Sequence, residues 1–238
     1  MTVLVIFDTE TTGLDAAVEE ICQFACVVHR EGEPLSETLE MESLCNPGKQ
    51  IDPAAAAIHK ISDEMVKDAV PAAELIPSWF REIVEFAGGD DIVLGGHNTG
   101  FDWKFLRRHL RISDRVLPLC TMRMARRIDP LADNHKLEYL YRDRFNLKSD
   151  RTVRAHDALS DVWMSFELLQ HWRKYFPRPD YLGIAKELLQ PIKLEVMPFG
   201  KHKGVPFSDI PRHYLSWLAK QDENMDMDVR YTAGVWGG

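Results

Sequence analysis

The stretch VLVIFDTETTG, residues 3–13, decides the fold class of this chain. Its first five residues are apolar and mostly β-branched, which predicts a buried strand, and Gly13 ends the polar turn that follows. Along a strand, side chains at i and i+2 point to the same face, so Asp8 and Glu10 are expected side by side. The stretch therefore predicts a central strand that ends in two adjacent carboxylates.

Strands and helices then alternate along the first 176 residues. Composition and spacing predict strands at 21–28, 38–44, 92–96 and 117–121, and helices at 62–68, 72–86, 101–110, 122–128, 136–145 and 155–172. Strands in succession, followed by strands interleaved with helices, indicate an α/β fold. We expect a mixed central sheet flanked by helices.

The segment Pro177-Arg178-Pro179 interrupts this pattern and marks the clearest boundary. Beyond it, the sequence predicts a helix at 181–189, a basic segment bounded by glycines (FGKHKG, 199–204) and a helix at 211–220. We therefore expect three parts, and we expect the last eight residues, 231–238, to fray. These parts are a domain over 1–176, a linker with a short helix over 177–195, and a small C-terminal module over 196–238.

The composition is that of a globular protein. Of 238 residues, 45% are hydrophobic and 28% are charged, which excludes disordered and low-complexity classes. The first apolar run is far shorter than the ~20 residues of a membrane helix, and no basic segment precedes it as in a signal peptide. The four cysteines form no CxxC pair, which predicts reduced thiols. We expect a cytoplasmic protein with no membrane partner.

Charge is distributed unevenly along the chain. Residues 1–102 carry 20 acidic and 5 basic side chains, whereas residues 103–177 carry 16 basic and 9 acidic ones. This asymmetry permits an acidic, cation-binding surface beside a basic one, although solvated faces of mixed charge would look the same. Basic side chains on helices can follow a phosphate backbone or cover apolar surface. The candidates for phosphate contact are Lys104, Arg107, Arg108, Arg111, Arg123, Arg126 and Arg127.

Three further residues suggest chemistry: Asp102 after the strand at 92–96, and His156 and Asp161 near the start of the long helix. Taken singly, each has a simpler explanation, since Asp102 can cap a helix and the other two can lie at the surface. Five residues turn about 140° around a helix, so His156 can act with Asp161 only from the segment leading into it. Adjacent carboxylates repel unless a cation neutralises them, and oxygen ligands suit Mg²⁺ or Mn²⁺.

In this order, Asp8-x-Glu10, Asn98-x-x-Phe101-Asp102 and His156-x4-Asp161 resemble the DEDDh branch of the DEDD superfamily of 3′–5′ exonucleases. The stretch FDTETTGL (7–14) and the segment AIHKI (57–61) add to this resemblance, which covers about residues 1–176. The FGKHKG segment and residues 209–218 are similar to the C-terminal region of exonuclease X-type proteins.

The resemblance implies an RNase H-like fold and a 3′–5′ exonuclease that releases nucleoside 5′-monophosphates from DNA 3′ ends, in repair or processing. Two Mg²⁺ or Mn²⁺ ions would bind Asp8, Glu10, Asp102 and Asp161, and His156 would be the general base. The substrate contacts that it implies are Thr11, Leu14, Ile58, His59, Asn98 and Phe101.

Other functions stay open at this point. RNA 3′ ends are an alternative substrate, because a pocket that tolerates a 2′-hydroxyl would accept them. A polymerase-associated proofreading or nucleic-acid-binding module is another alternative. Many proteins that resemble this family dimerise, so a homodimer is also an alternative to a monomer. The FGKHKG segment is expected to be either a tight basic turn or a contact to a strand beyond the active site.

Overall fold

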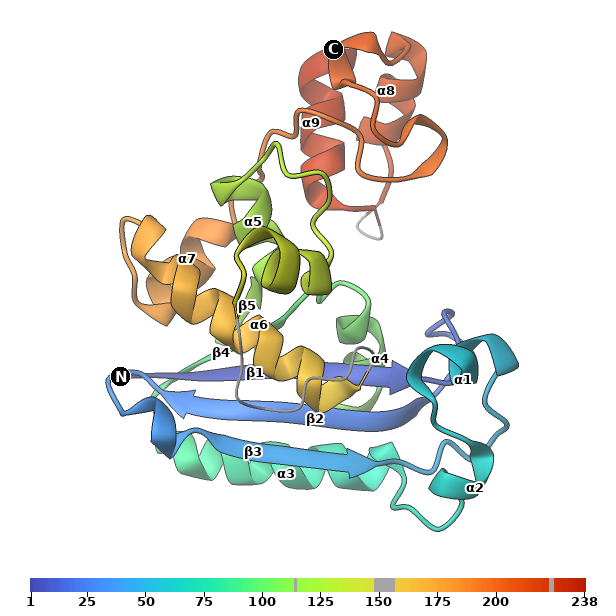
Figure 1. Ribbon diagram of the computed structural model, residues 1–238, viewed down its shortest axis with the longest axis vertical. Coiled ribbons are helices and arrows are strands. Elements are labelled where there is room, and N and C mark those ends of the chain that lie inside the picture. Colours follow the sequence, from blue (N-terminus) through green and yellow to red (C-terminus); the bar gives the residue numbers. More distant parts are fainter. Residues whose placement is uncertain (114, 148–156, 223–224) are drawn as a thin grey trace.

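A computed structural model describes residues 1–113, 115–147, 157–222 and 225–238 (Figure 1). A five-stranded sheet of order β3-β2-β1-β4-β5 forms its centre. The central strand β1 is antiparallel to β2 and parallel to β4, so the predicted mixed sheet is confirmed. The strands are β1 (Thr2–Thr11), β2 (Ile21–Arg30), β3 (Leu39–Leu44), β4 (Asp91–Gly96) and β5 (Leu117–Cys120).

Helices cover both faces of the sheet, and the alternation of β1 decides what each face meets. Val3, Val5 and Phe7 pack in one hydrophobic cluster with residues of α3 (Ala72–Ala87) and α4 (Asp102–His109). Leu4 and Ile6 pack in a second cluster with the helices of the opposite face. These helices are α5 (Thr121–Ile128), α6 (Ala158–Trp172) and α7 (Tyr181–Leu188). A strand buried on both faces must be apolar throughout, which explains the unbroken run at 3–7.

Most remaining elements are short. They are α1 (Pro53–His59), α2 (Asp63–Val66), α8 (Arg212–Ala219), α9 (Met227–Gly237), a π-helical segment (Tyr139–Arg144) and 3-10 turns at Leu35–Glu37, Arg173–Tyr175, Gly200–His202 and Phe207–Asp209. Two predicted helices differ in detail. The one at 136–145 is the π-helical segment. The one predicted from 155 begins at Ala158, because the side chain of Asp157 caps its first turn by accepting a hydrogen bond from the Ser160 amide.

The prediction of a frayed C-terminus was wrong. Residues Met227–Gly237 form α9, whose Val229 and Ala233 pack against Leu215 and Leu218 of α8 in a hydrophobic cluster of their own. Figure 1 shows the two helices side by side, set apart from the sheet. Since the apolar side of α8 would otherwise face water, α9 is needed to bury it.

The length of the helices and the burial of the cysteines can be compared with what the composition predicted. In the part of the chain that the structure describes, no helix is both long and apolar enough to cross a membrane. All four cysteines are free and buried. Burial raises the thiol pKa of Cys22, Cys26 and Cys45 to about 12, so these thiols stay protonated and weakly nucleophilic.

Candidate metal centre and active site

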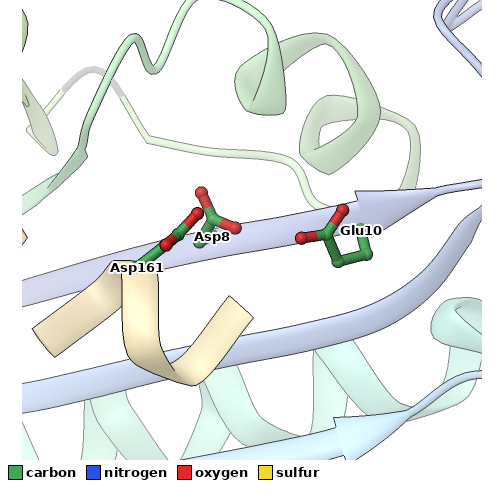
Figure 2. A group of neighbouring side chains, drawn as sticks. All are labelled: Asp8, Glu10 and Asp161. Carbon is green, nitrogen blue, oxygen red and sulfur yellow. The ribbon is translucent and has the colours of Figure 1, made fainter. Parts of the chain in front are cut away.

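Three carboxylates meet between β1 and α6. Asp8 and Glu10 follow Leu4 and Ile6 at two-residue steps along β1, so they point toward the face that α6 covers. Asp161 lies in the first turn of α6. One carboxylate oxygen from each lies within 4.8 Å of the others (Figure 2). The tertiary structure thus joins two neighbouring acids to a third that is about 150 residues away in the chain.

These acids destabilise one another in their charged forms. Burial, followed by the negative charges of neighbouring carboxylates, raises the pKa of Asp8 well above its usual range. The same causes raise the pKa of Glu10 to about 8 and that of Asp161 to about 7. Carboxylate oxygens gathered this closely, with charges that repel one another, are the donor set that a hard divalent cation binds. The residues present therefore fit a divalent metal.

Asp102, the fourth acid, lies beside this group on α4. Its side chain is buried, and its Oδ1 accepts a 2.6 Å hydrogen bond from Thr9 Oγ1. Burial raises its pKa to about 6, against the opposing effect of the Thr9 hydrogen bond. Its charge in turn raises the pKa of Asp8 and Glu10. Phe101 occupies the N-cap of α4, so Asp102 is the first helical residue rather than the cap.

Sequence reasoning missed Thr9. It lies between the two acids of β1 and, by strand alternation, belongs to the opposite face, where α4 packs. The hydroxyl of Thr9 holds the carboxylate of Asp102 in place. A hydroxyl-bearing residue between two acids was the only signal for this role in the sequence.

Asp157 and Gln23 were also missed. Asp157 caps α6, accepting from the Ser160 hydroxyl at 2.8 Å, and Gln23 Nε2 on β2 lies 3.4 Å from its carboxylate. The cap fixes the first turn of α6, which carries Asp161. An aspartate three residues before a serine at a helix start is the signal that could have shown it. His156 lies outside the described residues, so its role as general base stays a prediction.

Two of the predicted substrate contacts are exposed apolar side chains near the end of β1. Leu14 is 86% exposed and Ile58, on α1, is 53% exposed. The Asp52 amide donates to the Thr12 carbonyl at 3.0 Å, which ties the start of α1 to the end of β1. Figure 1 shows α1 just beyond the tip of the β1 arrow. Two exposed apolar side chains there suit contact with the faces of a terminal nucleotide.

Thr11 and His59 are buried and bonded within the protein. Thr11 Oγ1 donates to the Gly13 carbonyl at 2.8 Å. His59 Nδ1 accepts from the Ile61 amide at 3.0 Å, and its Nε2 lies 3.9 Å from Cys22 Sγ. Both side chains shape the turn that carries Leu14 and the end of α1.

Asn98 and Phe101 lie between β4 and Asp102. Asn98 is exposed and adopts a left-handed backbone conformation with φ of 59°, which asparagine tolerates better than most residues. Phe101 is half-buried and packs on Phe105 with ring centroids 5.1 Å apart. The tight turn at Asn98 brings Asp102 back over the end of the sheet.

Several of the basic side chains named as candidates for phosphate contact are bonded within the protein. Arg123 pairs with Asp228 at 2.8 Å and Arg126 pairs with Asp226 at 2.8 Å, and the two arginine side chains are 14% and 5% exposed. Neither side chain is therefore free to contact phosphate. Arg108 bonds Glu20 and the loop after β1, and Arg127 bonds Glu187. Lys104, Arg107 and Arg111 are exposed and remain candidates.

The raised pKa values predict how pH affects the metal-free protein. A carboxyl whose pKa is higher in the folded state stabilises the fold at low pH, and this contribution is lost as pH rises through the folded value. For Asp102, Asp161 and Glu10 that range is about 6 to about 8. In EDTA, we therefore expect the free energy of unfolding to fall from about pH 4, where these carboxyls ionise in the unfolded chain, to about pH 8, where they are ionised in the folded protein as well, measured by urea unfolding.

A carboxylate variant and added Mg²⁺ test whether this pH dependence comes from the clustered acids. Asp161→Asn should flatten the pH dependence, because one of the repelling charges is gone. Added Mg²⁺ should stabilise the wild type more at the upper pH than at the lower, because the ion binds the charged form. An identical pH profile for the wild type and the variant would contradict the assignment.

A family model described as "Exonuclease" (RNase T) matches residues 5–169 of this chain. The chain belongs to this exonuclease family. A second model, described as "Putative quorum-sensing-regulated virulence factor", matches residues 185–223 of the exonuclease. The match over 5–169 includes the four acids and all of the sheet except residues 2–4 of β1, so it covers the site described above.

Known relatives agree with this family. The exonuclease is 27% identical over 242 residues to Exodeoxyribonuclease 10 of Escherichia coli (strain K12), a match that covers 95% of each chain. It is 34% identical over 162 residues to a DNA polymerase III subunit epsilon-like protein of Rhodobacter capsulatus, covering 66% of this chain and 22% of that protein.

A solved structure, "Exonuclease X in complex with 5' overhanging duplex DNA", matches with a TM-score of 0.60 and 28% identity. The match covers 78% of the exonuclease and 99% of that chain. The predicted RNase H-like fold and the DEDD-type exonuclease resemblance are thus confirmed.

Proposed function

We propose that this exonuclease removes nucleotides one at a time from DNA 3′ ends and releases nucleoside 5′-monophosphates. The observation that carries the proposal is the meeting of Asp8, Glu10 and Asp161 within 4.8 Å, with Asp102 beside them. Hydrolysis of a phosphodiester develops negative charge on the attacking and leaving oxygens. Four carboxylates alone would repel that charge, so the site requires cations.

We assign Asp8, Glu10, Asp102 and Asp161 as the ligands of two Mg²⁺ or Mn²⁺ ions. When bound, such ions stabilise the charge on both oxygens of the displacement. The four carboxylates approximately balance two divalent ions, so the loaded site is close to neutral and can accept a phosphate. Thr9 keeps Asp102 aimed at the site through its 2.6 Å hydrogen bond.

His156 is proposed as the general base that takes the proton of the attacking water, because an imidazole with a pKa near ~6.5 does so at neutral pH. His156→Ala is expected to lower the rate constant of the chemical step about 10²-fold or more while the thermal unfolding midpoint stays unchanged. The measurement is a single-turnover rate at saturating metal, compared with His171→Ala on the far end of α6. Unaltered turnover in His156→Ala would remove this role.

The terminal nucleotide is proposed to lie between the loop after β1 and α1. Leu14 and Ile58 would contact the base and sugar, since both are exposed near the end of β1. Thr11, His59, Asn98 and Phe101 would border this pocket, the first two through the local geometry that they maintain.

DNA is the proposed substrate because the relative that aligns over nearly the full chain is an exodeoxyribonuclease, and the matched structure holds duplex DNA with a 5′ overhang. Such a duplex presents a recessed 3′ end. An oligonucleotide labelled at the 3′ or at the 5′ end, as DNA and as RNA, digested with Mg²⁺, Mn²⁺ or EDTA, tests polarity, sugar preference and metal need together. The proposal expects the 3′ label to be released at once as a mononucleotide, from DNA and only with metal.

The outcomes of this digest separate the alternatives. Faster release from RNA would establish an exoribonuclease instead. No release from any substrate would favour a nucleic-acid-binding module, and release only with an added polymerase would favour a proofreading subunit, as the similarity to an epsilon-like polymerase subunit suggests. Sedimentation of the same preparation distinguishes a monomer from a homodimer.

We further propose that residues 1–176 form the nuclease domain, 177–195 a linker with a short helix, α7, that packs on the sheet, and 196–238 a separate module. The support is a hydrophobic cluster confined to residues 194–233, distinct from those on the two faces of the sheet.

A further inference from the structure

We propose that an aromatic and basic surface of the C-terminal module binds a single-stranded stretch of nucleic acid. The proposal rests on the proposed function and extends it to the part of the chain beyond the catalytic site. The aromatic–basic surface is formed by the FGKHKG loop and one side of α8. Its members are Phe199, Lys201, His202, Lys203, Tyr214 and Trp217.

Its aromatic rings form a row. The ring centroids of His202 and Tyr214 are 4.7 Å apart, and those of Tyr214 and Trp217 are 5.4 Å apart. Tyr214 and Trp217 are three residues apart, so they are neighbours on the surface of α8. Tyr214 also packs against the core of the module, to which Leu215 and Leu218 belong. Trp217 is nonetheless 51% exposed. A large aromatic ring left in water at the end of such a row is available for stacking.

The loop that carries the lysines is held in shape by its own backbone. The Met197 amide donates to the Val205 carbonyl at 2.9 Å, and the Gly204 amide donates to the Met197 carbonyl at 2.8 Å. The Lys203 amide closes a turn onto the Gly200 carbonyl at 3.1 Å. Phe199, at the start of this loop, is 40% exposed. The surface is therefore presented by an ordered turn and a helix.

The positive charge of the module is concentrated in its first half. Residues 196–221 contain four lysine or arginine side chains and one acid, Asp209, whereas the whole module, 196–238, contains five basic and five acidic side chains. Within the ranges that the structure covers, Lys201, Lys203 and Arg212 are exposed and form no ion pair. In this they differ from Arg108 of the nuclease part, which is paired with Glu20. Unpaired cations beside exposed aromatic faces are the two features with which proteins hold single strands. Duplex bases are already stacked on one another, so the rings favour a single strand.

Binding of the full chain to a single-stranded oligothymidylate of about 30 nucleotides, in EDTA to prevent cleavage, tests this proposal by fluorescence anisotropy. Trp217→Ala should weaken binding at least about fivefold, as expected for the loss of one stacked base. The double variant Lys201→Ala/Lys203→Ala should also bind more weakly, and its slope of log Kd against log salt should fall by about 0.7 for each phosphate that the protein no longer neutralises.

The matched control is Tyr175→Ala. Tyr175 is 56% exposed, and Lys174 Nζ lies 5.1 Å from its ring centroid, so it is an aromatic–lysine pair outside this surface. It should bind like the wild type. If Trp217→Ala proves less stable than the wild type, the lysine variant decides, because both lysines are exposed.

Three results would overturn the proposal. The first is an unchanged Kd for the single strand in both Trp217→Ala and Lys201→Ala/Lys203→Ala, and the second is an equal loss of affinity for a blunt duplex and for the single strand. The third is that Trp217→Ala dissociates a dimer while its Kd for the strand stays unchanged. Digestion of a trinucleotide with Mg²⁺ keeps this test apart from the proposed function. The surface variants should cleave it at the wild-type rate. If the wild type itself fails to cleave, the proposed function is wrong, while the anisotropy result still decides whether the surface binds a strand.

Discussion

Asp8→Asn is expected to lower exonuclease activity by at least about 10²-fold at any metal concentration. The stabilisation of charge by bound cations is worth several kcal/mol, and each 1.4 kcal/mol lost is a factor of about ten in rate. Asp8 lies at the centre of the set, since its pKa is raised by burial and by Asp102, Asp161 and Glu10. Release of mononucleotides from a labelled DNA strand, titrated with Mg²⁺ and Mn²⁺, measures the effect.

The same variant should be more stable than the wild type in EDTA at about pH 8, because one of the repelling buried charges has been removed. Loss of activity together with a gain in stability separates a metal ligand from a residue needed for folding. Asp68→Asn, an exposed aspartate before α3, is the matched control and should change neither property. A fall in both activity and stability for Asp8→Asn would contradict the assignment.

Asp228→Ala is expected to destabilise the protein by about 3–5 kcal/mol, the usual cost of removing one partner from a buried ion pair. The carboxylate of Asp228 is fully buried, and it accepts from Arg123 at 2.8 Å, from Arg126 at 3.2 Å and from the Ile192 amide at 2.9 Å. Its removal leaves two guanidinium groups in a poorly hydrated site. Urea unfolding monitored by tryptophan fluorescence measures the loss.

A double-mutant cycle tests whether the arginines cause this loss. Once Asp228 is gone, Arg126→Ala should cost much less than it does in the wild type, because residues in one network are not additive. Glu195→Gln, an exposed carboxylate near the same linker, should be neutral. Additive effects of the two alanine substitutions would show that Asp228 acts independently of Arg126.

The ion pairs of Asp228 also join α9 to α5, so the C-terminal module is attached to the nuclease part of the chain through charged side chains. The loop of the aromatic–basic surface lies elsewhere in this module, between Met197 and Val205. Attachment and strand binding are therefore assigned to different residues, and the variants above address them separately.

The amino-acid sequence by itself determined the sheet and the acids on its central strand. In an apolar run followed by Asp8-Thr9-Glu10, the two acids must lie on the same face of the strand, because the alternation of side chains along a strand is a local property of the backbone. The order of the acids, together with His156 and the motifs around residues 7–14, 57–61 and 98–102, indicated the exonuclease family. The FGKHKG segment was recognised as basic and residues 209–218 as part of the same resemblance, but the row formed by the rings of His202, Tyr214 and Trp217 was not predicted.

Only the tertiary structure decided which side chains are free to act. Arg108, Arg123 and Arg126 looked alike in the sequence as candidates for phosphate, yet each is bonded to an acid far away in the chain. Likewise, α9 is stabilised by packing Val229 and Ala233 against the apolar side chains of α8. Helical spacing and charge can be read from neighbours in the chain, but the ion pairs of these three arginines depend on partners that folding brings from about 90 or more residues away.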